Sequence, residues 1–244
     1  YYGELVDRSD EESKRFGGFL RKQDLEDHKV EWVNPIHVDY HGYQVWELPP
    51  NGQGIVALMA LNVLNNFQFK DRDVDCIHTQ MEALKMAFAD AKEYVTDPKC
   101  MNMPVDDLIS VDYGKQRASQ IGHLALPPRV DKPHGSGTVY LCTADKDGNM
   151  VSYIQSNYMG FGSGIVVDGV SLQNRGYDFS LDPSHVNYLM PHKKTYHTII
   201  PGFLTKDDKP VGPFGVMGGY MQPQGHMQVV TNMIDFHLNP QMAL

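Results

Sequence analysis

The stretch GTVYLCTADKDGNMVSYIQS, residues 137–156, decides the fold. Residues 138–144 are mostly β-branched or aromatic, which favours a β-strand. Asp147-Gly148 is a strong signal for a hairpin turn, and residues 150–158 supply a second strand. The sequence therefore predicts an antiparallel hairpin whose first strand begins at Thr138.

The turn admits a second interpretation. Asp145, Asp147 and Asn149 follow the one-three-five spacing of oxygen ligands in a calcium loop. An EF-hand also needs glycine at its sixth position and glutamate at its twelfth, where this sequence has Met150 and Ser156. The hairpin turn is therefore the better supported interpretation.

A short glycine-rich segment, Gly135-Ser136-Gly137, precedes the hairpin and is typical of a flexible linker. A threonine that starts a strand after such a linker suits an N-terminal nucleophile. Cleavage before Thr138 would free an α-amine with a pKa near ~8, which can act as base for the hydroxyl of the same residue. The sequence contains no GxSxG elbow, so an ordinary serine triad has no support.

Composition bounds the class of protein. The chain has 244 residues, 41% of them hydrophobic and 21% charged, which indicates one large or two small folded domains. The net charge of −9 argues against a nucleic-acid partner, and no apolar run approaches the ~18 residues of a membrane span. Three scattered cysteines without a CxxC pair exclude a disulfide scaffold and a cysteine-rich zinc module.

The histidines do not have the spacing of metal ligands, so we expect neither a metal nor a cofactor. His197 and His226 are the two histidines that lie near glycine motifs.

Charged residues are concentrated before Thr138, which predicts solvated helices in the first part and a buried sheet in the second. Helices are predicted at residues 10–16, 55–64, 78–95 and 224–236. A further helix is predicted to begin near residue 23. The predicted strands outside the hairpin cover residues 41–48, 165–167, 198–204 and 212–216, with a turn at Asp207-Asp208. The glycine-rich loop 160–164 is interpreted either as a tight turn or as a ligand site.

Several motifs of the chain resemble those of the gamma-glutamyltransferase (glutathione hydrolase) family, in a divergent bacterial-type branch. Segments that resemble the start of that family's small subunit are residues 137–152, 161–164, 172–180 and 217–219. Segments that resemble the end of its large subunit are residues 17–25, 40–45, 49–54 and 82–90. Their order along the chain makes the resemblance specific.

The resemblance implies an α+β fold, the αββα sandwich of N-terminal-nucleophile hydrolases. We expect the sequence to be a piece that lacks both ends of the family's chain. Residues 1–137 would be the C-terminal part of the large subunit, helical with a linker. Residues 138–244 would be the sheet-rich N-terminal part of the small subunit. A proenzyme would cut itself between Gly137 and Thr138, and the two subunits would stay associated.

The resemblance also implies roles for individual residues. Thr138 would be the nucleophile, its α-amine the base, and Ser156 a hydroxyl that supports it. The backbone N–H groups of Gly218 and Gly219 would form the oxyanion hole. Asp178 would bind the α-amine of a γ-glutamyl substrate such as glutathione, and water or an amine would accept the acyl group.

Other substrate-binding positions depart from the family pattern. Tyr158 replaces an asparagine, Arg175 a glutamine or glutamate, and His197-Thr198 a pair of serines. Val139 stands where the family has a second threonine, and the family's carboxylate-binding arginine would lie upstream of this sequence. Arg175 offers only donors and a positive charge, and with a protonated His197 it would favour anions. Two further alternatives thus stay open: an oxamate amidohydrolase or glutaryl acylase type that takes a dicarboxylic monoamide without an α-amine, and a non-catalytic fragment. The sequence does not determine the cellular compartment of the protein, and the cytoplasm is slightly favoured over the periplasm.

Overall fold

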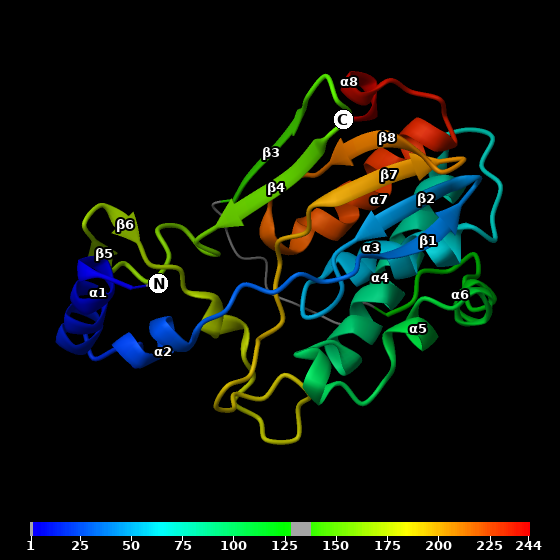
Figure 1. The fold of residues 1–244 in the computed structure, drawn as a ribbon. Helices are drawn as coiled ribbons and strands as arrows, with labels where there is room; N and C mark the ends of the chain where they lie inside the picture. Colours follow the sequence, from blue (N-terminus) through cyan, green and yellow to red (C-terminus); the bar gives the residue numbers. More distant parts are fainter. Residues whose placement is uncertain (1, 128–137) are drawn as a thin grey trace.

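A four-stranded antiparallel sheet, in the order β1-β2-β7-β8, forms the centre of the fold (Figure 1). We describe residues 2–127 and 138–244 of a computed structural model. The strands are β1 (Ile36–Tyr40), β2 (Tyr43–Glu47), β7 (Gly202–Lys206) and β8 (Lys209–Phe214). Because β2 pairs with β7, the segments before and after Thr138 share one sheet.

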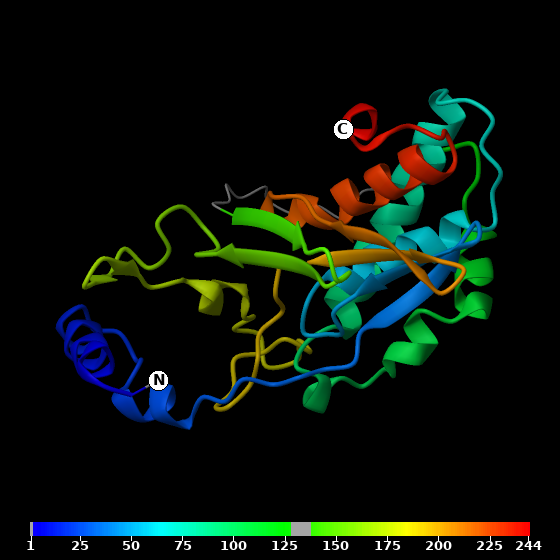
Figure 2. The ribbon, with the colours of Figure 1, turned by 45° about the horizontal axis from the view of Figure 1, so that its top comes forward.

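Helices cover one face of this sheet (Figure 2). The innermost is α3 (Gly54–Leu64), which is buried at every position and contacts both β1 and β2. Around it lie α4 (Val74–Tyr94), α6 (Val111–Ala118) and α7 (Gln222–Ile234). The continuous apolar sequence of α3 is explained by this central place, since a helix surrounded on all sides needs no polar face.

The predicted hairpin consists of β3 (Thr138–Ala144) and β4 (Met150–Ser156). Asp145 accepts hydrogen bonds from the backbone N–H groups of Asp147 and Asn149. The residues with the spacing of a calcium loop therefore stabilise the hairpin turn. The hairpin contacts the main sheet through β4 and β8, and the Ser152 hydroxyl donates to the Gly202 carbonyl at 2.9 Å. Its opposite face carries exposed apolar side chains at Val139, Leu141, Val151 and Tyr153.

A smaller group of elements lies away from the main sheet: α1 (Glu4–Arg15), α2 (Lys22–Asp27), β5 (Val166–Val167) and β6 (Val170–Ser171). The Arg8 guanidinium joins α1 to the β5-β6 turn through an ion pair of 2.6 Å with Asp168. In the glycine-rich loop before β5, a Cβ on Gly162 would lie 2.3 Å from the Leu172 carbonyl oxygen. That glycine is thus required by the close approach of the loop to its own chain. The remaining elements are η1 (Pro98–Cys100), α5 (Val105–Leu108), η2 (Arg175–Asp178), η3 (Gly219–Met221) and α8 (Pro240–Ala243).

Some predicted boundaries were wrong. The strand expected at 41–48 corresponds to β2 alone and begins only at Tyr43, because His41-Gly42 takes positive φ angles and forms the turn between β2 and β1, a strand that was not predicted. The strand expected at 198–204 begins only at Gly202, since residues 195–200 run as irregular chain along the loop before α3. The predicted linker 135–137 lies outside the described residues. None of the described helices is long and apolar enough to cross a membrane.

Candidate functional site

Thr138 and Ser156 face each other at the end of the hairpin opposite its turn. The two residues pair in the strand register, and the Thr138 hydroxyl oxygen lies 3.1 Å from Ser156 Oγ. The Tyr158 backbone N–H donates to Ser156 Oγ at 2.9 Å. Tyr158 itself has a φ angle of 75°, in the left-handed region. Thr138 is buried, so its hydroxyl is held in a fixed place away from bulk water. Gly137, the other residue of the predicted processing site, lies outside the described residues.

Gly218 and Gly219 form the turn that leads into α7. Their φ angles are 136° and 59°, a region that favours glycine. The Met221 N–H donates to the Gly218 carbonyl at 3.1 Å, which fixes the peptide plane that carries the Gly219 N–H. Neither glycine N–H donates a hydrogen bond to any described residue. Two neighbouring N–H donors of this kind are suited to an oxyanion.

Asp178 lies next to two tyrosine hydroxyls. The Tyr158 hydroxyl donates to Asp178 Oδ1 at 2.6 Å, and the Tyr220 hydroxyl donates to the same oxygen at 2.9 Å. Burial, followed by the Asp178 charge and hydrogen bond, raises the pKa of both phenols, so both stay protonated donors at neutral pH. Tyr220 directly follows the Gly218-Gly219 turn, and Asp178 is thereby joined to that turn.

Arg175 is buried, and its guanidinium carbon lies 5.1 Å from the centre of the Tyr158 ring. Nη1 donates to Thr198 Oγ1 at 2.5 Å, and the buried Nη2 has no hydrogen-bond partner among the described residues. Burial lowers the pKa of Arg175 while the Asp178 charge raises it, but an arginine stays charged in proteins. Within the described chain, Arg175 thus donates to the Thr198 hydroxyl through Nη1, while its buried Nη2 has no acceptor.

His197 carries no positive charge at neutral pH. Burial, and then the neighbouring Arg175 guanidinium, lowers the pKa of His197 to about 3. Its Nδ1 accepts the Ile199 N–H at 3.3 Å, as a neutral imidazole can. The expectation that a protonated His197 attracts anions is therefore wrong, because the same burial that places it in the site removes its proton.

Sequence reasoning missed two residues of this region, Gln53 and Tyr220. The Gln53 side chain is fully buried, and its Nε2 donates to the carbonyls of Thr198 at 2.6 Å and Gly219 at 2.7 Å. Those partners lie 145 and 166 positions along the chain. Gln53 lies in segment 49–54, one of the segments that resemble the family. Its hydrogen-bond partners are seen only in the folded chain.

His226 is a core residue. Its Nδ1 lies 2.5 Å from Glu47 Oε1, and both side chains are fully buried between α7 and β2. The described residues contain no group of three metal-ligating side chains. The second histidine singled out from the sequence thus belongs to a buried polar pair.

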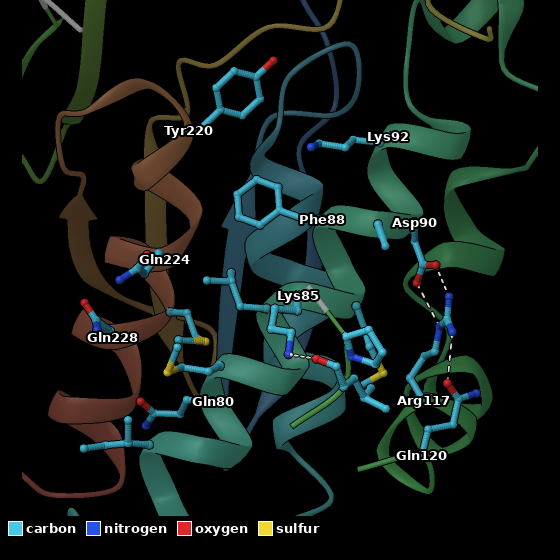
Figure 3. A pocket seen from close by; sticks show the side chains of 18 of the residues that line it. Gln80, Lys85, Phe88, Asp90, Lys92, Arg117, Gln120, Tyr220, Gln224 and Gln228 are labelled. Carbon is cyan, nitrogen blue, oxygen red and sulfur yellow. Dashed lines mark hydrogen bonds and ion pairs between the residues drawn. The ribbon is translucent and has the colours of Figure 1, made fainter. Parts of the chain in front are cut away.

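A cavity of about 1030 Å³ lies elsewhere, between α4 and α7 (Figure 3). Gln80, Phe88 and Gln228 line it, and Tyr220 lies at one end. Of the residues proposed above for catalysis or substrate binding, none lines this cavity. The candidate site is therefore the network around Thr138, and Tyr220 belongs both to this network and to the lining of the cavity.

Comparison with known proteins agrees with the geometry. The family model for gamma-glutamyltranspeptidase matches residues 1–244. The chain belongs to the gamma-glutamyltranspeptidase family. Among its relatives, the glutathione hydrolase-like YwrD proenzyme of Bacillus subtilis (strain 168) is 40% identical over 249 residues, which cover 100% of this chain and 47% of that protein. The oxamate amidohydrolase proenzyme of Klebsiella pneumoniae is 32% identical and is matched over 96% of this chain and 45% of its own length.

A solved structure confirms the predicted α+β fold of this gamma-glutamyltranspeptidase family member. The cephalosporin acylase from Bacillus halodurans is 58% identical, with a TM-score of 0.94 over 100% of this chain and 45% of that chain. The fold is therefore that of the N-terminal-nucleophile hydrolases. The chain spans about half the length of the curated relatives that it matches.

Proposed function

We propose that the protein is a self-processing amide hydrolase that forms an acyl-enzyme on Thr138. The observation that carries the proposal is the placement of the Thr138 hydroxyl 3.1 Å from Ser156 Oγ at the first position of β3. The N–H groups of Gly218 and Gly219, which have no hydrogen-bond partner among the described residues, would supply the oxyanion site. The names of the relatives, a glutathione hydrolase-like proenzyme and an oxamate amidohydrolase proenzyme, agree with this class of reaction.

Self-cleavage needs no outside reagent except water. The Thr138 hydroxyl attacks the Gly137 carbonyl carbon and the peptide C–N bond breaks, so the acyl group moves from nitrogen to oxygen. Water then hydrolyses the ester. The products are a Gly137 carboxylate and a Thr138 residue with a free α-amine, which is the base that the next reaction uses.

In the processed enzyme, the α-amine takes the proton of the Thr138 hydroxyl as its oxygen attacks the substrate amide. The Gly218 and Gly219 N–H groups stabilise the negative charge that develops on the carbonyl oxygen, an effect typically worth about 3 kcal/mol of barrier for one donor. The leaving amine receives the proton, and an ester on Thr138 remains. Water attacks this ester with the same amine as base and releases the acid.

For the acyl group, we propose a chain that ends in a carboxylate and lacks an α-amine. The support is the buried Arg175 Nη2, which has no partner among the described residues. An unpaired buried donor is costly, and a charged one more so. A substrate carboxylate would pair with it. The acyl chain would then be held between Arg175 at its far end and the oxyanion glycines at its reacting end.

The second candidate is a γ-glutamyl amide such as glutathione, the substrate that the name of the YwrD relative suggests. Such a substrate carries an α-ammonium group that needs acceptors. Asp178 is the acceptor at this place, and its Oδ1 already receives two hydroxyl donors from Tyr158 and Tyr220, so an ammonium group would have to bind through Oδ2. Arg175 would repel the ammonium group as well. The geometry therefore favours the carboxylate-terminated amide.

The test compares kcat/KM for matched glutaryl and γ-glutamyl anilides, measured on the full-length processed enzyme. We expect the glutaryl compound to be cut at least as fast as the γ-glutamyl compound. Arg175→Gln should lower the glutaryl value by roughly tenfold or more, since hydrogen bonds to charged groups contribute about 1.5–3 kcal/mol. A γ-glutamyl preference of a hundredfold would overturn the choice of acyl group. Failure of the processed enzyme to cut either amide would overturn the proposed class of reaction.

A further inference from the structure

Gln53 joins two walls of the candidate site through one amide group. Its Nε2 donates one hydrogen bond to the Thr198 carbonyl at 2.6 Å and another to the Gly219 carbonyl at 2.7 Å. The side chain is fully buried, and its backbone N–H donates to the His197 carbonyl at 2.8 Å. Both hydrogens of the amide are therefore used, and both acceptors are backbone atoms beside proposed functional groups.

The contacts continue from Gln53 in both directions. On one side, Gly219 provides one of the two N–H groups of the proposed oxyanion site, and its carbonyl also accepts the Gln222 N–H at the start of α7. On the other side, Thr198 Oγ1 accepts the Arg175 Nη1 hydrogen bond at 2.5 Å. A chain of hydrogen bonds thus runs from the oxyanion turn through Gln53 and Thr198 to the guanidinium.

We propose that Gln53 is a positioning residue that sets the acyl-chain length of the substrate. The proposal rests on the proposed function, in which Arg175 binds the acyl carboxylate. One end of the acyl chain is then held at Gly219 and the other at Arg175, and Gln53 fixes the separation of these two anchors. Only a chain of matching length places its reacting carbonyl at both the Thr138 hydroxyl and the oxyanion donors.

The amide is suited to this task for a chemical reason. The two N–H bonds of a glutamine amide diverge and can reach two carbonyl oxygens at once. An ionised glutamate of the same shape would direct lone pairs at both carbonyls, and a protonated one could donate only one hydrogen bond. Gln53→Glu therefore keeps the volume and removes the link, while Gln53→Met removes the link without introducing a charge.

The experiment measures kcat/KM for succinyl, glutaryl and adipyl anilides on the full-length processed enzyme and its variants. The readout is the ratio between the best chain length and its neighbours. Because all substrates meet the same enzyme sample, a partly folded or partly processed variant changes every value equally and leaves this ratio unchanged. We expect Gln53→Glu and Gln53→Met to lower the ratio by about tenfold, since displacement of one anchor by a fraction of an ångström misaligns the reacting carbonyl.

Gln222 provides a matched control. It is another fully buried glutamine beside the same turn, but neither side-chain amide atom has a partner in the described structure. Gln222→Met should keep the length preference of the parent enzyme. A preference that is unchanged in both Gln53 variants, together with loss of the glutaryl rate in Arg175→Gln, would overturn the role of Gln53 and leave the proposed function standing. A glutaryl rate that Arg175→Gln does not change would overturn both, because the second anchor would then be absent.

Discussion

The Thr138 hydroxyl lies 3.1 Å from Ser156 Oγ across the open end of the β3-β4 hairpin. The strand register alone fixes this pair, because Thr138 and Ser156 are directly opposed. A neighbouring hydroxyl can hold the Thr138 oxygen in the direction of attack and donate to it once its proton has left.

Ser156→Ala should therefore lower kcat by about tenfold with little change in KM, the effect of one neutral hydrogen bond. Ser156→Thr keeps the hydroxyl and should retain most of the activity. Steady-state kinetics on the processed enzyme gives both values. Equal losses in the two variants would indicate that packing at this position, rather than the hydroxyl, is what matters.

Tyr220→Phe should make the site more tolerant of an α-amine. The substitution removes the 2.9 Å hydrogen bond to Asp178 Oδ1 and leaves the ring in place. A carboxylate that receives one hydrogen bond fewer is a better acceptor for an ammonium group, so the ratio of γ-glutamyl to glutaryl kcat/KM should rise by roughly tenfold. An unchanged ratio would show that the α-amine is not directed at Asp178.

The depressed pKa of His197 predicts acid sensitivity of the fold. The ordinary value of 6.5 falls to about 3 in the folded chain, so between these values the unfolded state binds a proton that the folded state does not. Stability from this residue is complete above pH 6.5 and is lost progressively as the pH falls towards 3. Urea unfolding at pH 7 and pH 5 should show a smaller drop for His197→Gln than for the parent enzyme. Equal drops would contradict the assigned pKa.

The buried pair of Glu47 and His226 gives a stability prediction. Removing one partner leaves the other buried without its hydrogen bond, so Glu47→Leu should lower the free energy of unfolding by roughly 3–5 kcal/mol. Replacing both partners, with Glu47→Leu and His226→Phe, should recover most of that loss. Urea unfolding of the two single variants and the double variant measures the coupling. Additive losses would show that the pair does not act as a unit.

The local part of the fold could be predicted from the sequence. The first strand of the hairpin has the predicted bounds, because Asp147-Gly148 fixes the turn and the β-branched residues before it favour a strand. The buried helix predicted at 55–64 corresponds to α3 (Gly54–Leu64), because its apolar residues continue around the whole helix. Strand β1 was not predicted, and the strand predicted at 41–48 included His41-Gly42, which forms the turn between β1 and β2.

The candidate site could be predicted only where a motif marked a residue. Thr138, Ser156 and the two glycines were predicted from the family resemblance, and the structure places the first two within hydrogen-bond distance. Gln53 was not predicted, because its partners are backbone carbonyls far along the chain and no side-chain pattern records them. The charge of His197 was predicted wrongly, because burial decides its pKa and burial is a property of the folded chain.

The identity of the nucleophile is the central claim, and the N-terminus of the smaller fragment of the purified full-length protein tests it most directly. We expect spontaneous cleavage into two associated pieces, with the smaller piece beginning Thr138-Val139-Tyr140. Thr138→Ala should stay uncut and inactive, because the substitution removes the attacking hydroxyl. A soluble, active protein that remains intact, or a fragment that begins at another residue, would show that Thr138 is not the nucleophile.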